Sequence, residues 1–266
     1  MPKLIWNAPG KRGYETGIDR GVLYLSGQPG VPWNGITGVT DKPLGGDAAS
    51  VYYDGQKVGN QAGATEYSAT LEAFMYPDEF AVCDGSALIN GLAMDNQERV
   101  PFGLSYRTKL GNDLNGQDAG YKVHLIYNAL AKPSERAYST QDSSAKALTF
   151  SWDLSTTPVT VQGRRATAHL SVDSTKTDPY LMAAFEELIY GNSSAAGIPT
   201  LPTMDQVVAL FTTWVTLQVV VHPDGTFTAS GPDPVVHFLA SDPNKFEISW
   251  HSANPVDALT YTVSSA

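Results

Sequence analysis

Four stretches of this chain alternate apolar and polar residues, and this alternation limits the possible folds more than any other feature. The clearest is 147–155, Ala-Leu-Thr-Phe-Ser-Trp-Asp-Leu-Ser. A period of two puts successive side chains on opposite faces of a β-strand, so the stretch predicts a half-buried strand. The pattern recurs in residues 66–75, 121–128 and 166–173, with Ile126 as the one apolar residue on a polar side. Four such strands predict an antiparallel sheet with one packed and one solvated face.

The polar members of these strands form the predicted solvated face. They are Glu66, Ser68, Thr70, Glu72, Lys122, His124, Thr149, Ser151, Asp153, Thr167, His169 and Asp173. Four carboxylates stand against Lys122 alone, so the face is predicted to be acidic, with hydroxyl groups between the charges. Two interpretations stay open on the pattern alone: an ordinary solvated surface, or the polar lining of a channel.

The composition is that of a globular protein with a sizeable core. The chain has 266 residues, of which 42% are hydrophobic and 17% charged, enough for one large all-β domain or a domain with a small appendage. Its apolar runs are far shorter than the about 20 residues of a membrane span, and its first residues lack an apolar signal core. We therefore expect neither membrane insertion nor secretion. The single cysteine, Cys83, is expected to be a buried small hydrophobe.

The charge balance argues against a protein that grips DNA. The formal net charge is −10, whereas phosphate binding requires clustered lysine and arginine. Half of this charge comes from residues 201–266, which carry six acids and one base. The C-terminal segment is therefore expected to be a separate surface.

Two long segments, 27–64 and 83–120, are rich in glycine, proline and turn-forming residues. Within the first, Asp54-Gly55 predicts a hairpin turn, because both positions of such a turn need positive φ values. Within the second, the run 111–118 is dense in turn residues. It lacks the acidic spacing and closing glutamate of a calcium loop, so we interpret it as a plain turn.

The clearest helix signal begins at Asp178-Pro179, an N-cap followed by a proline at the first helical position, and ends at Gly191. This helix is expected to cover the apolar face of the sheet. A capping box of Thr203 and Gln206 predicts a second, shorter helix. About five short strands should follow between residues 214 and 263.

These signals divide the chain into three parts. Residues 1–192 are expected to form the main β domain with an N-terminal arm and long loops. Residues 193–203 are a linker by composition, and residues 204–266 form a small C-terminal β domain.

No catalytic constellation is recognisable in the sequence. It has no Gly-x-Ser-x-Gly elbow, no phosphate-binding loop and no cysteine or histidine pairs at metal-ligand spacing. The five histidines are scattered. We therefore predict that the chain is not an enzyme and needs neither a cofactor nor a metal.

Several segments together resemble the major tail tube proteins of long-tailed, non-contractile phages. They are Gly-Val-Leu-Tyr-Leu at 21–25, Pro-Trp-Asn-Gly at 32–35, Glu-Ala-Phe-Met-Tyr-Pro-Asp-Glu-Phe at 72–80, Pro-Phe-Gly-Leu-Ser-Tyr-Arg-Thr at 101–108, and 120–136. The resemblance covers roughly residues 20–192. It implies a mainly β fold of the tail-tube type, a β-sandwich or half-barrel with one flanking α-helix, here with a C-terminal β appendage.

The resemblance also implies a function. Such proteins stack as hexameric rings, in which each subunit gives four strands to a barrel around a lumen. Glu66, Glu72, Asp153 and Asp173 would then face the channel and repel DNA phosphates during ejection. The implied partners are further copies of the chain, a tape measure protein in the lumen, tail-tip and tail-terminator proteins at the ends, and DNA in transit. The implied location is the virion, after synthesis in the host cytoplasm.

The long loops would bridge successive rings. The inter-ring candidates are Trp33, Asp41, Tyr52, Tyr53, Asp54, Asn112 and Asp113. By the same resemblance, the C-terminal segment is expected to decorate the outside of the tube.

Two alternative functions stay open. The first is a β-sandwich glycan-binding protein or hydrolase, suggested by many carboxylates and by Trp33, Tyr52, Tyr53, Trp214 and Trp250, although aromatic residues at strand spacing usually belong to a core. The second is a head-tail or neck-joining structural protein of similar fold. Only a tube subunit is expected to form an open-ended polymer.

Overall fold

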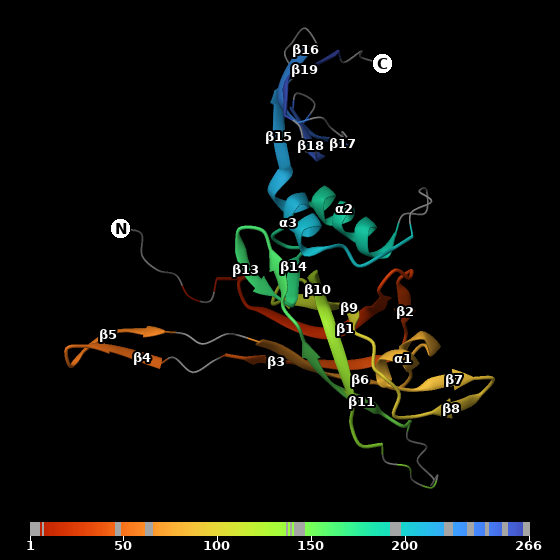
Figure 1. Ribbon diagram of the computed structural model, residues 1–266. Coiled ribbons are helices and arrows are strands. Elements are labelled where there is room, and N and C mark those ends of the chain that lie inside the picture. The colour runs from red at the N-terminus through yellow and green to blue at the C-terminus, as the bar shows by residue number, and fades with distance from the viewer. Residues whose placement is uncertain are drawn as a thin grey trace. The chain divides into compact units, whose positions relative to one another are not determined.

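The computed structural model describes residues 6, 8–45, 49–61, 66–136, 138, 140, 147–191, 198–220, 226–232, 237–242, 245–251 and 255–262, with backbone only from residue 213 onward. The fold is mainly β, with antiparallel strand pairs throughout the described sheets and a few helices (Figure 1). The predicted fold class is confirmed. No helix among the described residues has the length and hydropathy of a membrane span.

The chain divides into two compact units. The first comprises residues 1–176 and 189–201, and the second comprises 177–188 and 202–266. Two hydrogen bonds connect the segment 189–201 to the rest of the first unit. The Tyr24 hydroxyl donates to the Ile189 carbonyl at 2.6 Å, and the Gly30 amide donates to the Pro199 carbonyl at 2.7 Å.

A large antiparallel sheet forms the first unit, with strands in the order β2-β1-β9-β10-β11-β6-β3 and with β14 paired to β10. Their bounds are β1 Gly13–Leu25, β2 Val31–Trp33, β3 Ile36–Leu44, β6 Glu66–Ala73, β9 Phe102–Asn112, β10 Gly116–Pro133, β11 Phe150–Thr156 and β14 His169–Asp173. Of the predicted strands, 66–75 and 147–155 correspond to β6 and β11. The stretch 166–173 is divided, because a separate strand ends at Thr167 before β14 begins at His169.

β10 is the strand that joins two parts of the sheet. Its first half pairs with β9 on one edge and with β14 on the other, and its last five residues pair with β11. The register with β9 shifts between Ile126 and Ala129, where Asn128 has a φ of 47°. Such a bulge bends a strand and increases its twist. The strand predicted over 121–128 is therefore only the middle of a much longer one.

Aromatic rings fill the core of this unit. Trp152, Phe80 and Trp33 are almost completely buried, and their ring centroids lie 4.5–5.8 Å apart. The Trp33 indole donates to the Met75 carbonyl at 2.8 Å. Its assignment to an inter-ring loop was wrong: Trp33 ends the short strand β2, and its side chain is buried in the core.

A buried carboxylate is satisfied at the edge of this core. Asp84 is 5% exposed and accepts hydrogen bonds from the Trp152 indole and the Arg136 guanidinium. It ends helix α1 (Ala81–Asp84), which follows the 3₁₀ turn η1 (Asp78–Phe80). Because a buried charge is costly without partners, these bonds fix α1 to the sheet.

Three small hairpins complete the first unit. Their strands are β4 Ala49–Tyr53 with β5 Gln56–Gln61, β7 Ala87–Ile89 with β8 Leu92–Met94, and β12 Val159–Val161 with β13 Arg164–Thr167. The predicted Asp54-Gly55 turn is confirmed, with φ values of 48° and 77°. Asn90-Gly91 forms the equivalent turn between β7 and β8.

Two helices belong wholly or mainly to the second unit: α2 (Pro179–Tyr190) and α3 (Met204–Thr213). Both start signals are confirmed. The Asp178 carboxylate accepts the Leu181 amide at 3.3 Å, and the Thr203 and Gln206 side chains cap each other's backbone amides. The rings of Phe185 and Phe211 meet edge-on, 5.7 Å apart, so α2 packs on α3.

Five strands follow α3 in the second unit, as predicted. They are β15 Trp214–Val220, β16 Thr226–Pro232, β17 His237–Asp242, β18 Lys245–His251 and β19 Pro255–Thr262. They pair as β15-β18-β17 and β16-β19. The expected linker, 193–203, lies partly outside the described residues.

Candidate functional site

The first part of the candidate site is a polar face shared by β6 and β11. Their antiparallel register places Glu72 opposite Ser151, Thr70 opposite Asp153, and Ser68 opposite Ser155. Directly opposite residues share a face, and the alternate residues on the other face are buried or partly buried. Glu66, Glu72 and Asp153 are exposed on this face, and Thr149, just before β11, is also exposed.

β3 and the end of β10 extend this surface on either side, and we call the whole four-strand surface the polar face. Lys42 of β3 lies opposite Ser68, and Lys132 of β10 lies opposite Asp153. The described charged residues of the polar face are thus Glu66, Glu72 and Asp153 against Lys42 and Lys132. Neither lysine was predicted to lie on this face, so the polar face is less acidic than predicted.

Asp153 accepts two side-chain hydrogen bonds on this face. Its Oδ1 accepts the Thr70 hydroxyl at 2.8 Å and the Lys42 ammonium at 3.1 Å. The hydrogen bonds from Thr70 and Lys42 lower the pKa of Asp153. Both members of the ion pair are more than half exposed, so the pair fixes side-chain positions more than it stabilises the fold.

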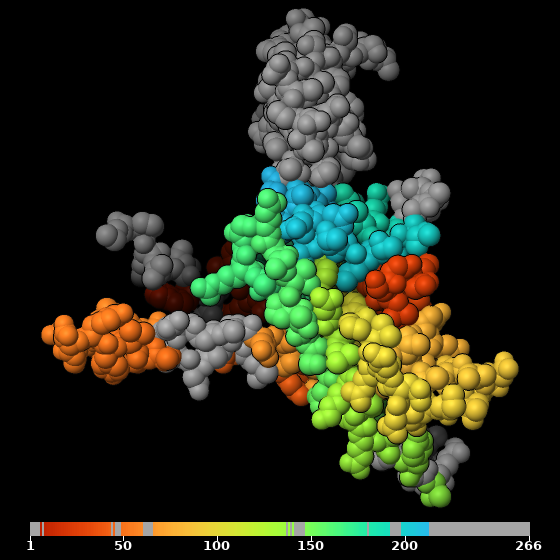
Figure 2. Space-filling view, viewed as in Figure 1, coloured from red at the N-terminus to blue at the C-terminus, as the bar shows by residue number. Residues whose placement is uncertain are grey.

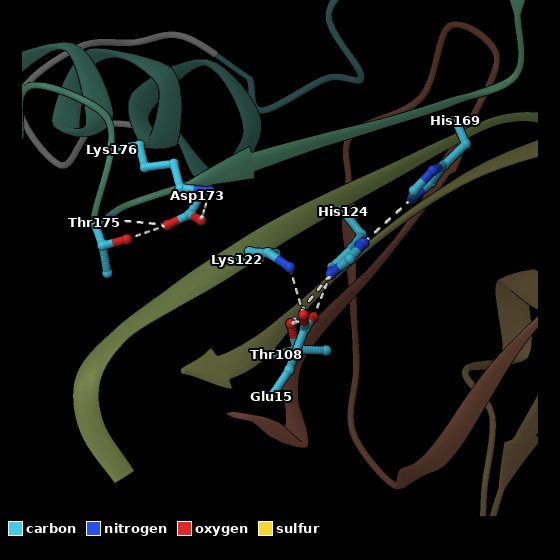
Figure 3. Close-up of polar contacts among 8 residues, drawn as sticks. All are labelled: Glu15, Thr108, Lys122, His124, His169, Asp173, Thr175 and Lys176. Carbon is cyan, nitrogen blue, oxygen red and sulfur yellow. Dashed lines mark hydrogen bonds and ion pairs between the residues drawn. The ribbon is translucent and has the colours of Figure 1, made fainter. Parts of the chain in front are cut away.

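Three of the remaining strand candidates, Lys122, His124 and His169, lie elsewhere, in a network on β1, β9, β10 and β14 (Figure 3). Glu15 of β1 is its centre: it pairs with the Lys122 ammonium, accepts the Thr108 hydroxyl at 2.5 Å, and lies 3.3 Å from His124 Nε2. Burial raises the pKa of Glu15, but hydrogen bonds from Lys122 and Thr108 outweigh it, and the net pKa is lowered. Lys122 therefore neutralises a carboxylate within the subunit.

His124 and His169 continue this network into the sheet. His124 Nδ1 lies 3.2 Å from His169 Nε2, so one of the two rings must donate to the other. Burial lowers the pKa of both histidines, that of His169 to about 4, with the charge of His124 as a second cause. Both imidazoles are therefore neutral at neutral pH.

Two tyrosines sandwich these histidines in what we call the four-ring stack. Tyr106 lies parallel to His124 with centroids 4.7 Å apart, and His169 lies parallel to Tyr67 at 4.6 Å. Both tyrosine hydroxyls donate to Asp41 Oδ1, at 2.5 Å from Tyr67 and 3.3 Å from Tyr106. Asp41, an inter-ring candidate, thus holds the edge strand β3 to this interior stack.

The polar face and the network are separate regions of the sheet, because the register of β10 with β9 shifts between them. Lys122 and His124 share their side of β10 with Ile126, which is fully buried in the core. The placement of His124 on a solvated face was wrong: it is 7% exposed. The apolar residues on the other side, such as Val123 and Leu125, are fully buried too, so this part of β10 is covered on both faces.

The two other strand candidates, Asp173 and Thr167, have local structural contacts. Asp173 accepts the amide and hydroxyl of Thr175, at 3.0 and 2.6 Å, and pairs with Lys176, in the turn that follows β14 (Figure 3). The Thr167 hydroxyl donates to the His169 carbonyl at 3.2 Å. None of these contacts lies on the polar face.

The other loop candidates lie in exposed turns and hairpins. Tyr52 and Tyr53 are 61% and 68% exposed on β4, and Asp54 begins its turn. Between β9 and β10, Asn112 Oδ1 accepts two backbone amides of the turn, and Asp113 accepts the Gly10 amide at 2.8 Å. These contacts confirm a turn at 111–118.

No protein-family model and no curated protein matches the sequence. Among solved structures, the chain is similar to a chain of the anti-feeding prophage baseplate, with 14% identity, a TM-score of 0.32, and coverage of 65% of this chain and 100% of that one. It is also similar to a chain of the sheath-tube complex of an extracellular contractile injection system, with 16% identity, a TM-score of 0.29, and coverage of 58% and 88%.

Proposed function

We propose that this chain is a structural subunit that assembles into stacked hexameric rings, and that the polar face lines the channel of the resulting phage tail tube. The observation that carries the proposal is the polar face itself, four neighbouring strands with exposed polar side chains on one side and an aromatic core on the other. A wide water-filled barrel needs this arrangement, because residues alternate between its lumen and its packed exterior.

The edges of the polar face support ring closure. Among the described strands, β3 pairs with β6 alone, and the register between β9 and β10 ends at Ala129, so residues 130–133 pair only with β11. Unpaired edges invite pairing with another chain. Four alternating antiparallel strands leave the two edge strands antiparallel to each other. In a ring of copies related by rotation, β3 of one subunit can therefore pair with β10 of the next, and all strands around the ring stay antiparallel.

The charges of the polar face suit DNA that must pass without binding. Affinity for DNA grows with the number of phosphates that lysine and arginine neutralise. Lys42 is already paired with Asp153, and the exposed Glu66 and Glu72 add repulsion. DNA, a tape measure protein in the channel and terminal proteins at the tube ends are the partners of this proposal, and the chain has no catalytic role in it.

Electron microscopy of the concentrated, purified chain, together with sedimentation, tests this proposal. Open-ended tubes built from six-fold rings with a central channel are the expected result. Single closed rings that never stack would favour a neck-joining protein instead. A chain that stays monomeric even after purified tail tips are added as nuclei would overturn the proposal.

A further inference from the structure

The β7–β8 hairpin is an exposed element without a polar side chain in its strands. They read Ala-Leu-Ile and Leu-Ala-Met. Their large side chains, Leu88, Ile89, Leu92 and Met94, are between 39% and 58% exposed. The hairpin extends from the first unit beside α1 and stands out in the space-filling view, coloured gold (Figures 1 and 2).

The hairpin is also preorganised. Asn90 and Gly91 both have positive φ, as the tightest hairpin turn requires. Cross-strand pairing puts Ile89 opposite Leu92 and Ala87 opposite Met94, so one face is entirely apolar. Because a lone two-stranded hairpin is marginally stable in water, such a face is expected to be covered by another surface.

The same unit holds a cavity of about 620 Å³ whose lining is largely apolar but also includes Asp19 and Arg20. Strands β1 and β2, the start of β3 and the segment around Ile189 and Pro199 line it, with Val22, Trp33 and Ile36 among the apolar residues. Two lining glycines let neighbouring side chains pack closely against the backbone: a Cβ atom at Gly21 would lie 2.4 Å from a methyl carbon of Ile36, and one at Gly30 would lie 2.8 Å from the Tyr24 ring.

We propose that the β7–β8 hairpin of one subunit inserts its Ile89–Leu92 face into this cavity of a second copy of the chain. The inference rests on the proposed ring assembly, which requires a head-to-tail contact between two different surfaces of one subunit. The hairpin is convex and apolar, and the cavity is concave and largely apolar. No hairpin residue lines the cavity of its own subunit, so a second copy can fill it.

The contact supplies specificity to the ring interface. A short hairpin covers much less than the roughly 800 Å² per partner of a stable interface, so the pairing of β3 with β10 must supply the rest. Strand edges alone tolerate a shift of two residues, because such a shift keeps every side chain on its own face. An apolar anchor in a preformed pocket defines one register and concentrates the binding energy in a few residues.

Two exposed positions allow each half of the contact to be removed without disturbing the fold. Leu92→Glu puts a charge on the hairpin at a site that is 58% exposed. Asn34→Trp fills the cavity from its exposed rim, and the left-handed position of that turn belongs to Gly35, not to Asn34. Leu188→Glu, at an exposed leucine of α2, is the matched control.

The test compares assembly of these variants alone and mixed, by sedimentation and electron microscopy. Each of the two contact variants should raise the concentration needed for assembly about 30-fold or more, whereas Leu188→Glu should assemble like the wild type. An equimolar mixture of Leu92→Glu and Asn34→Trp should form a discrete heterodimer, because only the intact hairpin of one and the intact cavity of the other can meet.

The outcomes separate this inference from the proposed function. If the wild type forms tubes and either contact variant forms them equally well, the hairpin contact is wrong while the ring assembly stands. A mixture that stays monomeric would show that the hairpin and the cavity are not partners. A wild-type chain that never assembles would overturn the ring assembly and the contact with it. Circular dichroism checks the fold of each variant, and Ile89→Glu, also at an exposed site, is the second hairpin variant.

Discussion

The two halves of β10 place polar side chains in opposite environments. Lys132, near its end, belongs to the exposed polar face, whereas His124 lies in the four-ring stack and is 7% exposed. Between them, the bulge at Asn128 shifts the register with β9. Alternation therefore marks the two sides of a strand but does not show which of them is exposed to water. A side chain on the polar face can contact a ligand, whereas a side chain in the stack makes contacts that stabilise the fold.

The largest expected effect concerns DNA and tests the charge of the polar face. Glu66→Lys with Glu72→Lys leaves Asp153 as the one described acid of this face, against four lysines. Assembled tubes should then bind short duplex DNA roughly 100-fold or more tightly at low salt, and lose this affinity as salt rises. Fluorescence anisotropy measures both.

The control for this variant makes the same change of charge away from the polar face. Glu79→Lys with Glu98→Lys, both at exposed positions, should change the DNA affinity of the tubes far less. Equal affinities for the two double variants would show that the polar face does not line the DNA path.

Removing a ring of the stack should cost more stability than removing an exposed ring. Tyr106 is 3% exposed and stacks on His124, so Tyr106→Ala should lower the free energy of unfolding by about 3–5 kcal/mol. Tyr53→Ala, at a 68% exposed site, should change it by less than about 0.5 kcal/mol. Urea denaturation of the monomer measures both, and similar losses would contradict the assigned burial.

The histidine pair predicts a pH dependence of stability. Because the pKa of His169 is about 4 in the folded chain and about 6.5 when exposed, the unfolded chain binds the extra proton between these values. The free energy of unfolding should therefore fall as the pH drops from about 6.5 to about 4, by up to about 3 kcal/mol.

His169→Phe isolates this effect, because it keeps a ring beside Tyr67 and removes the titrating group. The difference in unfolding free energy between wild type and variant should narrow or reverse as the pH falls through this window, while the carboxylates titrate alike in both. A difference that does not vary with pH would mean that the buried ring is not forced to stay neutral.

The smallest effect is expected for the exposed ion pair. Lys42→Ala should change the free energy of unfolding by less than about 1 kcal/mol, because Lys42 and Asp153 are both more than half exposed. A double-mutant cycle with Asp153→Asn measures the coupling. A coupling well above this value would mean that the pair is shielded from water.

Much of the fold could be predicted from local signals. The alternation in 66–75 and 147–155 identified β6 and β11, the cap at Asp178 identified α2, and Asp54-Gly55 identified a hairpin. Each of these signals depends on residues close in the sequence. The two strands of the polar face with the clearest alternation were therefore assigned correctly, together with their exposed charges.

The rest of the site depends on contacts between distant residues. Lys42 lies in a segment rich in glycine and proline, where no periodicity shows that it faces Asp153, 111 residues away. Glu15 likewise meets Lys122 and His124 only through strand pairing. Ile126 was the one available signal: an apolar residue on the polar side of 121–128 indicated that this side enters the core.

The central claim, that the polar face lines a channel, is tested most directly by labelling it in assembled tubes. Glu72→Cys introduces an exposed thiol on this face, whereas the native Cys83 is fully buried, and burial raises the pKa of its thiol to about 12, so it stays unreactive. Tubes of this variant, labelled with a small gold cluster and imaged by electron microscopy, should carry the label inside the bore. Label on the outer wall would contradict the account.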